Sequence, residues 1–266
     1  MSPLAFQGTA WALSGDGLAT AADALGVHAP EIWAVLAVET SGCGYLSDRR
    51  PQVLYERHIF HRLTKGRYDD GDISDPSSGG YGAHGAHQYE RLINAIARDR
   101  AAALQSASWG IGQVMGMNYA EAGFPGIEEM VAAMSQSEDR QLTAMSNFLV
   151  ANKLHTSLRA HDWTTFARGY NGPSYAVHRY DALLNGEFGK YSSGVLPDLN
   201  VRAAQLYLTY LGFHPGPVDG IAGRNTLAAL AEFQTRAGIP AVAVIGDETV
   251  ALLQAALPTG SVASAA

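Results

Sequence analysis

The amino-acid sequence predicts a mainly α-helical protein built from two unequal domains. Apolar residues recur at helical spacing along much of its 266 residues, and this period is the main sequence signal for amphipathic helices. The chain is also nearly twice as long as the ~150 residues expected of one domain. The stretch from Asn185 to Pro197 is rich in Gly and Ser and interrupts the helical pattern, as linkers do. We therefore predict a large domain at 1–187, a linker at 188–197, a small domain at 198–257 and a flexible tail at 258–266.

In the large domain, helical periodicity covers six segments. They are Leu18–Leu25, Glu31–Glu39, Tyr89–Ala103, Ile127–Ser135, Asp139–Asn152 and Trp163–Tyr170. Between Gly42 and Gly85 the pattern gives way to Gly, Pro, Asp and Ser, which leaves room for loops and a small hairpin. The small domain shows three helical segments, Asp198–Leu211, Asn225–Ala237 and Asp247–Leu257. Its length fits a compact three-helix module.

Composition excludes several classes of protein. The net charge is −7 and the basic residues form no long block, so we expect no nucleic-acid partner. No apolar run approaches the ~20 residues of a membrane span, so we expect no membrane insertion. The amino-terminal residues lack the basic and apolar regions of a signal peptide. The single Cys43 cannot form an intramolecular disulfide, and we expect a monomer stabilised by packing.

Glu39 is the first candidate for a catalytic group. The helical segment that contains it begins at Pro30 and Glu31 and stops at Gly42, so Glu39 lies at a helix carboxyl end. The unpaired carbonyls there and the apolar neighbours Leu36 and Val38 disfavour ionisation and raise a carboxyl pKa. A raised pKa suits a general acid. By itself, an ordinary solvated glutamate explains the residue equally well.

The surrounding motifs favour catalysis. AVETSG lies at 37–42, YERHIFHRLT at 55–64, GGYG at 79–82, SWGIGQVMG at 108–116 and ARGYNGP at 167–173. In this order they resemble the lysozyme-like superfamily of muramidases and lytic transglycosylases, and most closely the N-acetylmuramidase family common in phage endolysins. The resemblance covers most of residues 10–185 and implies a lysozyme-like, α-dominant catalytic domain. Thr40 stands where many transglycosylases have Ser, and this difference preserves a hydroxyl group at the position.

The resemblance also implies roles for single residues. Glu39 takes the position of the acid, Gln113 shapes the floor of the cleft, and Tyr170 and Asn171 flank it. An amide such as that of Gln113 can donate to and accept from a sugar, and a tyrosine ring can stack on one. Trp109 is a further candidate for stacking on a sugar, with a place in the core as the alternative.

A second catalytic group is needed for cleavage of a β-1,4 glycosidic bond. It is either another carboxylate or an internal nucleophile supplied by the sugar. Asp48 follows Glu39 by nine residues, as in some phage lysozymes, yet Leu54 stands where those enzymes have Thr. Glu56 lies inside the YERH segment, where it could instead pair with Arg57 or Arg62. The sequence leaves the choice between Asp48 and Glu56 open.

The small domain strongly resembles the peptidoglycan-binding module of many wall hydrolases. The resemblance is carried by Gln205, Leu211-Gly212-Phe213, Val218-Asp219-Gly220, Gly223, Thr226 and Phe233-Gln234. Asp219, Arg224 and Gln234 are candidates for contacts with the wall. We expect this domain to contribute mainly tethering, separable from glycosidase chemistry, because a weak binding module raises local concentration on a polymer.

Rival constellations exist. His58 with His61, and His84 with His87, each form an H-x-x-H pair that suggests a zinc amidase, but neither is the H-E-x-x-H form. Cys43 could serve a cysteine peptidase, although no local cysteine motif accompanies it. In a non-catalytic binding protein Glu39 would be incidental. We expect no metal and no other cofactor.

The combined prediction is a modular phage-type endolysin, a lysozyme-type glycoside hydrolase. It would cleave the bond between N-acetylmuramic acid and N-acetylglucosamine in bacterial peptidoglycan, its expected partner. The alternative is a lytic transglycosylase that leaves 1,6-anhydro ends. The resemblance further implies accumulation in the cytoplasm of a bacterial host, with release to the periplasm and wall by a separate membrane-permeabilising factor.

Overall fold

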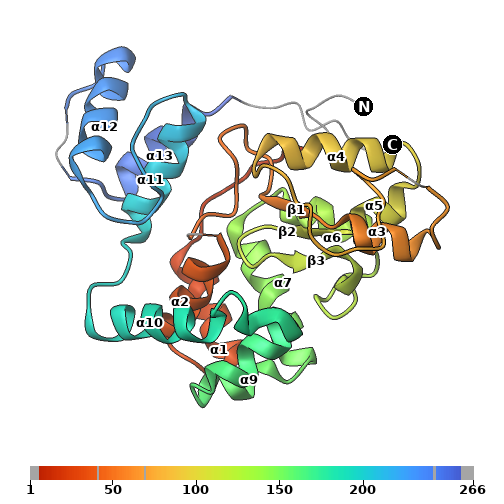
Figure 1. Ribbon diagram of the computed structural model, residues 1–266. Coiled ribbons are helices and arrows are strands. Elements are labelled where there is room, and N and C mark those ends of the chain that lie inside the picture. Colours follow the sequence, from red (N-terminus) through yellow and green to blue (C-terminus); the bar gives the residue numbers. More distant parts are fainter. Residues whose placement is uncertain (1–5, 41, 69, 242–243, 259–266) are drawn as a thin grey trace.

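The computed structural model describes residues 6–40, 42–68, 70–241 and 244–258, and within them the chain is predominantly helical. These ranges hold thirteen α-helices and three short strands, which confirms the predicted fold class. Figure 1 shows the helices α11 to α13 as a small domain at one side of a larger helical body. Apart from Pro258, the predicted tail lies outside the described residues.

Helix α2 (Ala29–Thr40) is the central helix of the large domain. Every residue from Glu31 to Leu36 is buried, because α10 (Tyr180–Ser193) and α1 (Gly15–Leu25) pack against it. A helix enclosed in this way must be apolar around most of its circumference. Helix α1 in turn packs against α7 (Glu138–Ala151), so α2 is fixed by neighbours that come from both halves of the large domain.

A small antiparallel sheet lies beside these helices. Its strands are β1 (Val53–Tyr55), β2 (Ala107–Trp109) and β3 (Val114–Met115), in the order β1-β2-β3. Val53 lies opposite Trp109, and Ser108 lies opposite Met115. Within the described part of 42–85, hairpin-like pairing is limited to two isolated antiparallel bridges, Tyr45 with Pro51 and Asp70 with Ser74. Strand β1 pairs instead with a strand about fifty residues away in sequence.

The other helices of the large domain cover the sheet and complete the core. They are α3 (Arg57–Leu63), α4 (Ala86–Ile96), α5 (Arg100–Gln105), α6 (Ile127–Met134), α8 (Leu154–Arg159) and α9 (Trp163–Tyr170), with short 3-10 turns η2 (Gly116–Asn118) and η3 (Pro173–Ala176). The single helix predicted over Tyr89–Ala103 is therefore two helices. Asp99 starts the second one, because its Oδ1 accepts a hydrogen bond from Ala102 N at 3.0 Å.

Helix α10 runs to Ser193 and thus includes the first residues of the predicted linker. Its glycines weaken the local preference for helix, but tertiary packing compensates: Leu184 is buried, and the Tyr191 ring lies 6.4 Å from that of Trp33. The connection outside helices is residues 194–198.

The small domain contains α11 (Leu199–Tyr210), α12 (Arg224–Ala237) and α13 (Asp247–Ala255). The predicted ranges agree with these helices to within two residues at each end. Asp198 begins α11 by accepting a hydrogen bond from Val201 N at 3.0 Å. The apolar core of this domain also includes Ala10 and Tyr45 of the large domain, so the two domains share packed surface.

No single helix in the described ranges has the length and apolar character to cross a membrane. Helices α1 and α2 together are long and apolar enough, but the two are bent by 103° relative to each other.

Candidate active site

Glu39 lies in the last turn of α2 and is partly buried. Burial raises the pKa of its carboxyl to about 7, and a hydrogen bond from Asn171 acts in the opposite direction. Asn171 Nδ2 donates to Glu39 Oε1 at 2.9 Å. The predicted direction of the pKa shift is confirmed. A carboxyl with this pKa holds a transferable proton near neutral pH, as a general acid must.

The end of α2 is fixed by hydrogen bonds on either side of Glu39. Thr40 Oγ1 donates to Ile111 O at 3.0 Å, which ties the helix to the turn between β2 and β3. Gly42 N donates to Leu36 O at 3.1 Å, and Gly42 has a positive φ of 82°. This left-handed conformation is favourable for glycine and ends the helix.

Tyr170 and Asn171 meet Glu39 from the end of α9. The Tyr170 hydroxyl donates to Gly112 O, and its ring stacks on Phe166 at a centroid distance of 5.5 Å. Asn171 follows the last turn, with its N–H bonded to Ala167 O, and its side chain points to Glu39. Asn171 Oδ1 is buried and has no hydrogen-bond partner among the described residues.

Gln113 organises the turn that receives these contacts. Its φ is +49°, and its Nε2 donates to Gly110 O at 2.8 Å while its Oε1 accepts from Ser108 Oγ at 2.8 Å. The amide is therefore turned into the protein. Gln113 holds the β2–β3 turn in shape, whereas the sequence suggested an amide that faces the sugar.

Trp109 does not line the site. Its side chain has no exposed surface, and its indole N–H donates to Leu104 O at 3.1 Å. The candidate role in stacking on a sugar is wrong, because strand β2 lies in the core and buries both of its faces. The alternative, a place in the core, is correct.

Glu56 precedes α3 and is mostly buried. Burial raises the pKa of its carboxyl, whereas the nearby His58 and a hydrogen bond from Tyr81 lower it. Glu56 Oε2 lies 3.2 Å from His58 Nδ1. The alternative pairing with arginine is not seen in the described chain: Arg57 lies 3.6 Å from Asp75, and Arg62 contacts the sulfur of Met117.

Two tyrosines connect the surroundings of Glu39 and Glu56. Tyr180 is the first residue of α10, and its pKa is raised by burial, then by the charge of Glu39 and of Tyr81. Tyr81 in turn interacts with Glu56. Tyr180 thus senses the charge of Glu39 and of Tyr81, and Tyr81 is hydrogen-bonded to Glu56. The sequence offered Tyr81 only as part of the GGYG segment and gave no signal for Tyr180, which lies after the last motif.

Asp48 belongs to another environment. It lies in the hairpin around the Tyr45–Pro51 bridge, and its Oδ2 lies 2.6 Å from Arg50 Nη2. The Arg50 guanidinium also lies over the Tyr89 ring at 4.1 Å. Asp48 thus forms an ion pair within the hairpin.

The histidines of the two H-x-x-H pairs, the rival candidates for a zinc site, contact different neighbours. His58 Nδ1 lies 3.2 Å from Glu56 Oε2, and His61 Nδ1 lies 3.3 Å from Ser74 Oγ. His87 Nδ1 lies 3.5 Å from Glu90. Within the described ranges, no three His, Cys, Asp or Glu side chains are grouped so that they could hold a metal ion.

Cys43 is a poor nucleophile in this fold. Burial, followed by the charge of Glu138, raises the pKa of the thiol to about 12. Its Sγ donates to Tyr45 O at 3.4 Å. A cysteine nucleophile reacts as the thiolate, so the thiol at this position is inert near neutral pH.

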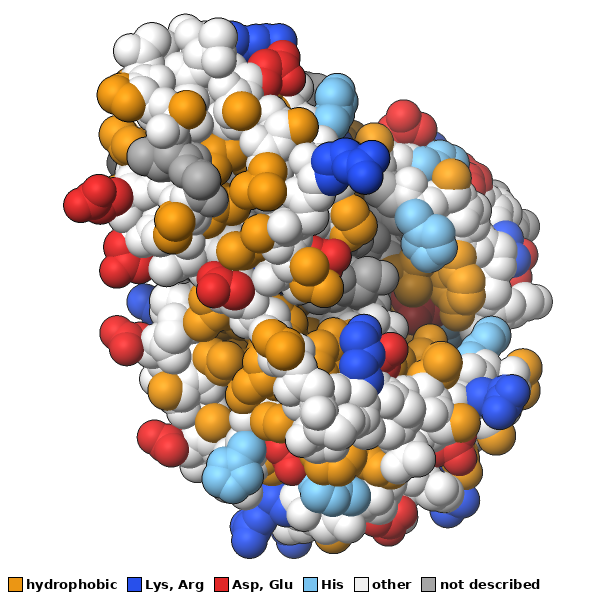
Figure 2. Space-filling model, turned by 90° about the vertical axis from the view of Figure 1, so that its left-hand side faces the viewer, with side chains coloured by type: hydrophobic (Ala, Val, Ile, Leu, Met, Phe, Trp, Pro, Cys, Tyr) orange, Lys and Arg blue, Asp and Glu red, His pale blue; other side chains and the backbone are white. Residues whose placement is uncertain are grey.

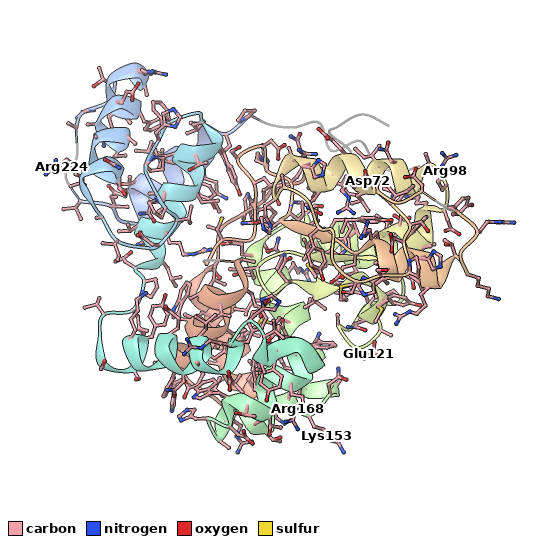
Figure 3. All side chains as sticks on the ribbon, in the orientation of Figure 1. Asp72, Arg98, Glu121, Lys153, Arg168 and Arg224 are labelled. Carbon is pink, nitrogen blue, oxygen red and sulfur yellow. The ribbon has the colours of Figure 1, made fainter. Side chains whose placement is uncertain are left out.

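The candidate wall-binding residues of the small domain differ in exposure. Asp219 Oδ1 accepts from Gln205 Nε2 and Ile221 N, both at 2.9 Å, which makes it part of the turn after α11. Arg224 projects from the outer edge of this domain (Figure 3). Gln234 is nearly buried and lines an apolar cavity of about 240 Å³. The other lining residues are Leu230, Phe233, Ile239, Pro240, Thr249 and Leu252.

Figure 2 shows the side of the molecule on which both domains are visible, with the small domain in the upper part. Hydrophobic side chains gather across the middle of this face, around a hollow to the right of its centre.

Comparison with known proteins agrees with this geometry. A family model described as N-acetylmuramidase matches residues 28–192, and one described as a putative peptidoglycan binding domain matches residues 197–253. Among solved structures, the chain is similar to the Burkholderia AP3 phage endolysin, with 39% sequence identity and a TM-score of 0.61. The alignment covers 68% of this chain and 70% of that one. No protein of curated function matches the chain.

Proposed function

Since this chain belongs to the N-acetylmuramidase family, we propose that it hydrolyses the β-1,4 bond between N-acetylmuramic acid and N-acetylglucosamine, with Glu39 as the general acid. The coarser assignment follows from the family and the second domain: the protein is a modular endolysin, a glycoside hydrolase that acts on peptidoglycan and binds it. The observation that carries the finer proposal is the pKa of about 7 at Glu39, beside the Asn171 amide.

Glu39 and Asn171 perform complementary tasks in this proposal. Protonated Glu39 donates its proton to the glycosidic oxygen as the bond to the anomeric carbon breaks. Asn171 Nδ2 orients the carboxyl and stabilises the carboxylate that remains.

Glu56 is the second carboxyl in the proposal. Burial is the largest influence on both carboxyl groups and raises the pKa of each. At Glu56, His58 and a hydrogen bond from Tyr81 act in the opposite direction and favour the ionised form, which a general base or a nucleophile requires. Different environments of two carboxyl groups are what assign acid and base in glycosidases. Asp48, held by Arg50, is left with a structural role.

Replacement of the proposed acid tests the function. Glu39→Gln preserves the shape of the side chain and removes the proton, so the turnover on peptidoglycan should fall at least ~10²-fold, the lower end of what a positioned general acid supplies. Glu121→Gln is the matched control, since Glu121 is exposed at the periphery of the large domain (Figure 3). Near-native turnover of a folded Glu39→Gln variant would contradict the proposal.

Product analysis by mass spectrometry separates hydrolysis from the transglycosylase alternative. Reducing N-acetylmuramic ends are expected, together with a large loss of turnover in Glu56→Gln and a small one in Asp48→Asn. Products with 1,6-anhydro ends and an active Glu56→Gln variant would instead identify a single-acid transglycosylase.

The small domain is proposed to contact the wall on the side of the Gln234 cavity and through Arg224, while Asp219 holds the fold. The domain limits 1–187 and 198–257 are kept in this proposal, with the helical residues to Ser193 counted with the large domain. The likeness to a phage endolysin supports accumulation in the host cytoplasm before release to the wall.

A further inference from the structure

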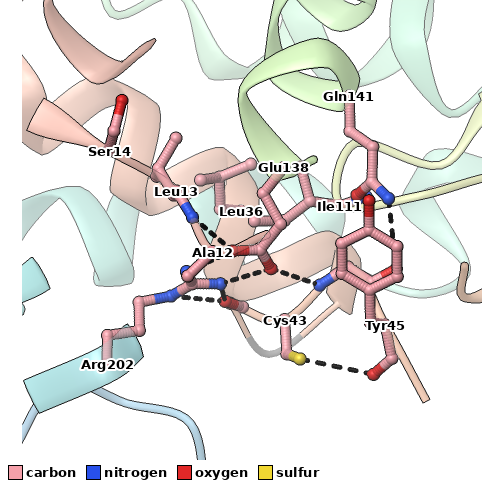
Figure 4. Close-up of polar contacts among 12 residues, drawn as sticks. Ala12, Leu13, Ser14, Leu36, Cys43, Tyr45, Ile111, Glu138, Gln141 and Arg202 are labelled. Carbon is pink, nitrogen blue, oxygen red and sulfur yellow. Dashed lines mark hydrogen bonds and ion pairs between the residues drawn. The ribbon is translucent and has the colours of Figure 1, made fainter. Parts of the chain in front are cut away.

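Arg202 of the small domain reaches into the large domain (Figure 4). Its side chain is fully buried. Its Nε donates to Gly42 O at 3.0 Å, and its Nη2 donates to the same carbonyl and to Glu138 Oε1, the latter at 2.7 Å. Its Nη1 contacts Glu138 Oε2, and the guanidinium lies 5.7 Å from the centre of the Trp33 ring. One side chain thus touches α2, the turn after α2 and the start of α7.

Glu138 completes this junction from the large domain. It has no exposed surface, and its two oxygens accept hydrogen bonds from Leu13 N and Gly44 N, each at 2.8 Å. Removal of one partner from a buried ion pair leaves an uncompensated charge, which is strongly unfavourable. The pair with Arg202 therefore holds the small domain in a defined position.

The turn held by this pair begins three residues after Glu39. Arg202 fixes its first part through Gly42 O, and Glu138 fixes its second part through Gly44 N. Gly44 is closely surrounded, because a Cβ atom there would overlap the Gln141 side chain. Thr40 before the turn is bonded to Ile111 O, and a residue of the other domain secures Gly42 within it.

Further contacts show that the small domain is docked rather than only tethered. The Tyr210 hydroxyl donates to Ala10 O at 3.1 Å, and the Tyr207 hydroxyl accepts from Ala12 N at 3.2 Å. Ala10 and Tyr45 also pack into the core of the small domain. The sequence-based expectation of a domain that contributes mainly tethering does not include this junction.

We infer that Arg202 is a positioning residue for Glu39, so that the docked wall-binding domain is part of the apparatus that aligns the general acid. The inference rests on the proposed role of Glu39. Without the guanidinium, Gly42 O loses its donors from Arg202, the last turn of α2 is released, and Glu39 gains freedom and water. A displacement of about 1 Å at a reacting group can cost roughly 10²-fold in rate.

Two variants of the full chain test this role. Arg202→Lys keeps the charge for Glu138 but lacks the planar set of donors that joins Gly42 O and the carboxylate at once. The double variant Arg202→Met with Glu138→Gln removes both charges together, so that no unpaired buried charge remains. Arg236→Met is the matched control, because Arg236 lies in the same domain, is 65% exposed and pairs with Glu232.

The readouts are kcat and KM on soluble, peptide-free glycan strands of peptidoglycan, the pH profile of kcat, co-sedimentation with sacculi, and thermal unfolding. For both variants we expect a kcat roughly ten- to a hundred-fold lower, with a smaller change in KM and retained binding to sacculi.

The pH profile of kcat should also change. Added water lowers the pKa of Glu39, and a general acid works only while it is protonated, so the alkaline limb of the profile should move to lower pH. The titratable groups that face Glu39 are Tyr170 and Tyr180, and both have raised pKa values and stay neutral.

The outcomes separate this inference from the proposed function. Near-native turnover of a folded Glu39→Gln variant would overturn the proposed function, whatever the Arg202 variants do. If Glu39→Gln is inactive while a folded Arg202→Lys or double variant keeps wild-type kcat and alkaline limb, the positioning role alone is overturned. Should one variant fail to fold, the other decides, since one retains the charge pair and the other removes it entirely.

Discussion

Asn171 tunes the proton of Glu39 from the end of a different helix. Its Nδ2 donates to Glu39 Oε1 at 2.9 Å and lowers the pKa of that carboxyl against the larger effect of burial. The donor favours the ionised form, as hydrogen bonds to a carboxylate do. The amide therefore balances two needs, a protonated acid before cleavage and a stable carboxylate after it.

We expect Asn171→Ala to shift the pH profile in a direction that identifies this role. Loss of the donor raises the pKa of Glu39 above about 7, so the protonated form persists to higher pH and the alkaline limb of kcat moves upward. Turnover at the optimum should fall about tenfold, because the acid loses its orienting partner. The measurement is kcat against pH on soluble glycan strands. An unmoved limb would show that the hydrogen bond does not act on the catalytic proton.

Cys43 provides the opposite case, a reactive residue type without a reactive role. Its thiol pKa is about 12 and its Sγ already donates to Tyr45 O. In Cys43→Ser the hydroxyl can make the same hydrogen bond, so kcat should change by less than about threefold, within the range of mild substitutions. Resistance of the native enzyme to thiol-alkylating reagents gives a second check. Inactivation of a folded Cys43→Ser variant would revive the peptidase alternative.

At the scale of elements, the sequence predicts those helices whose stability comes from their own local pattern, and it misses those that depend on tertiary packing. Helix α2 has a strong apolar pattern and clear ends, and the prediction of Glu31–Glu39 falls inside it. Helix α10 contains Gly186 and Gly189 and forms because it packs on α2. Its stability is tertiary, and a local pattern cannot predict it.

The glycines of α10 give a direct test of this explanation. A Cβ at Gly186 would meet nothing within 4 Å, and the residue is helical, so Gly186→Ala should stabilise the protein by about 0.4–1 kcal/mol by restricting the unfolded chain. Gly212 is the matched control: it also has open space around a Cβ, but its φ is +84°, which strains an alanine. Thermal or denaturant unfolding should therefore rank Gly186→Ala above wild type and Gly212→Ala below it.

The residues of the candidate site likewise divide into those that a local motif predicts and those that only tertiary packing brings into place. Glu39, Tyr170 and Asn171 belong to short motifs whose spacing carried the prediction, and the structure brings them together. Tyr180 comes from a segment without a motif, and Arg202 was not singled out within the small-domain resemblance. Their contacts arise from the packing of α10 on α2 and of α11 on the large domain. Trp109 shows that a residue can belong to a motif without lining the site, because its side chain is fully buried and packs in the core.

At the scale of the whole molecule, the shared core and the buried Arg202–Glu138 pair join the two domains. This coupling has an observable signature, since all four tryptophans, Trp11, Trp33, Trp109 and Trp163, belong to the large domain. Tryptophan fluorescence therefore follows the large domain and, through Trp33, its contact with Arg202, whereas far-ultraviolet circular dichroism follows the helices of both domains.

We expect the two signals of the wild-type protein to change in one coincident thermal transition, the mark of two-state unfolding. In the double variant Arg202→Met with Glu138→Gln, the donors to Gly42 O are gone while the linker at 194–198 still joins the domains, so the two signals should separate. Arg236→Met should keep them coincident, because its ion pair with Glu232 lies within α12. Separate transitions in the wild type would mean that the domains unfold independently, in which case the small domain could not hold the end of the catalytic helix.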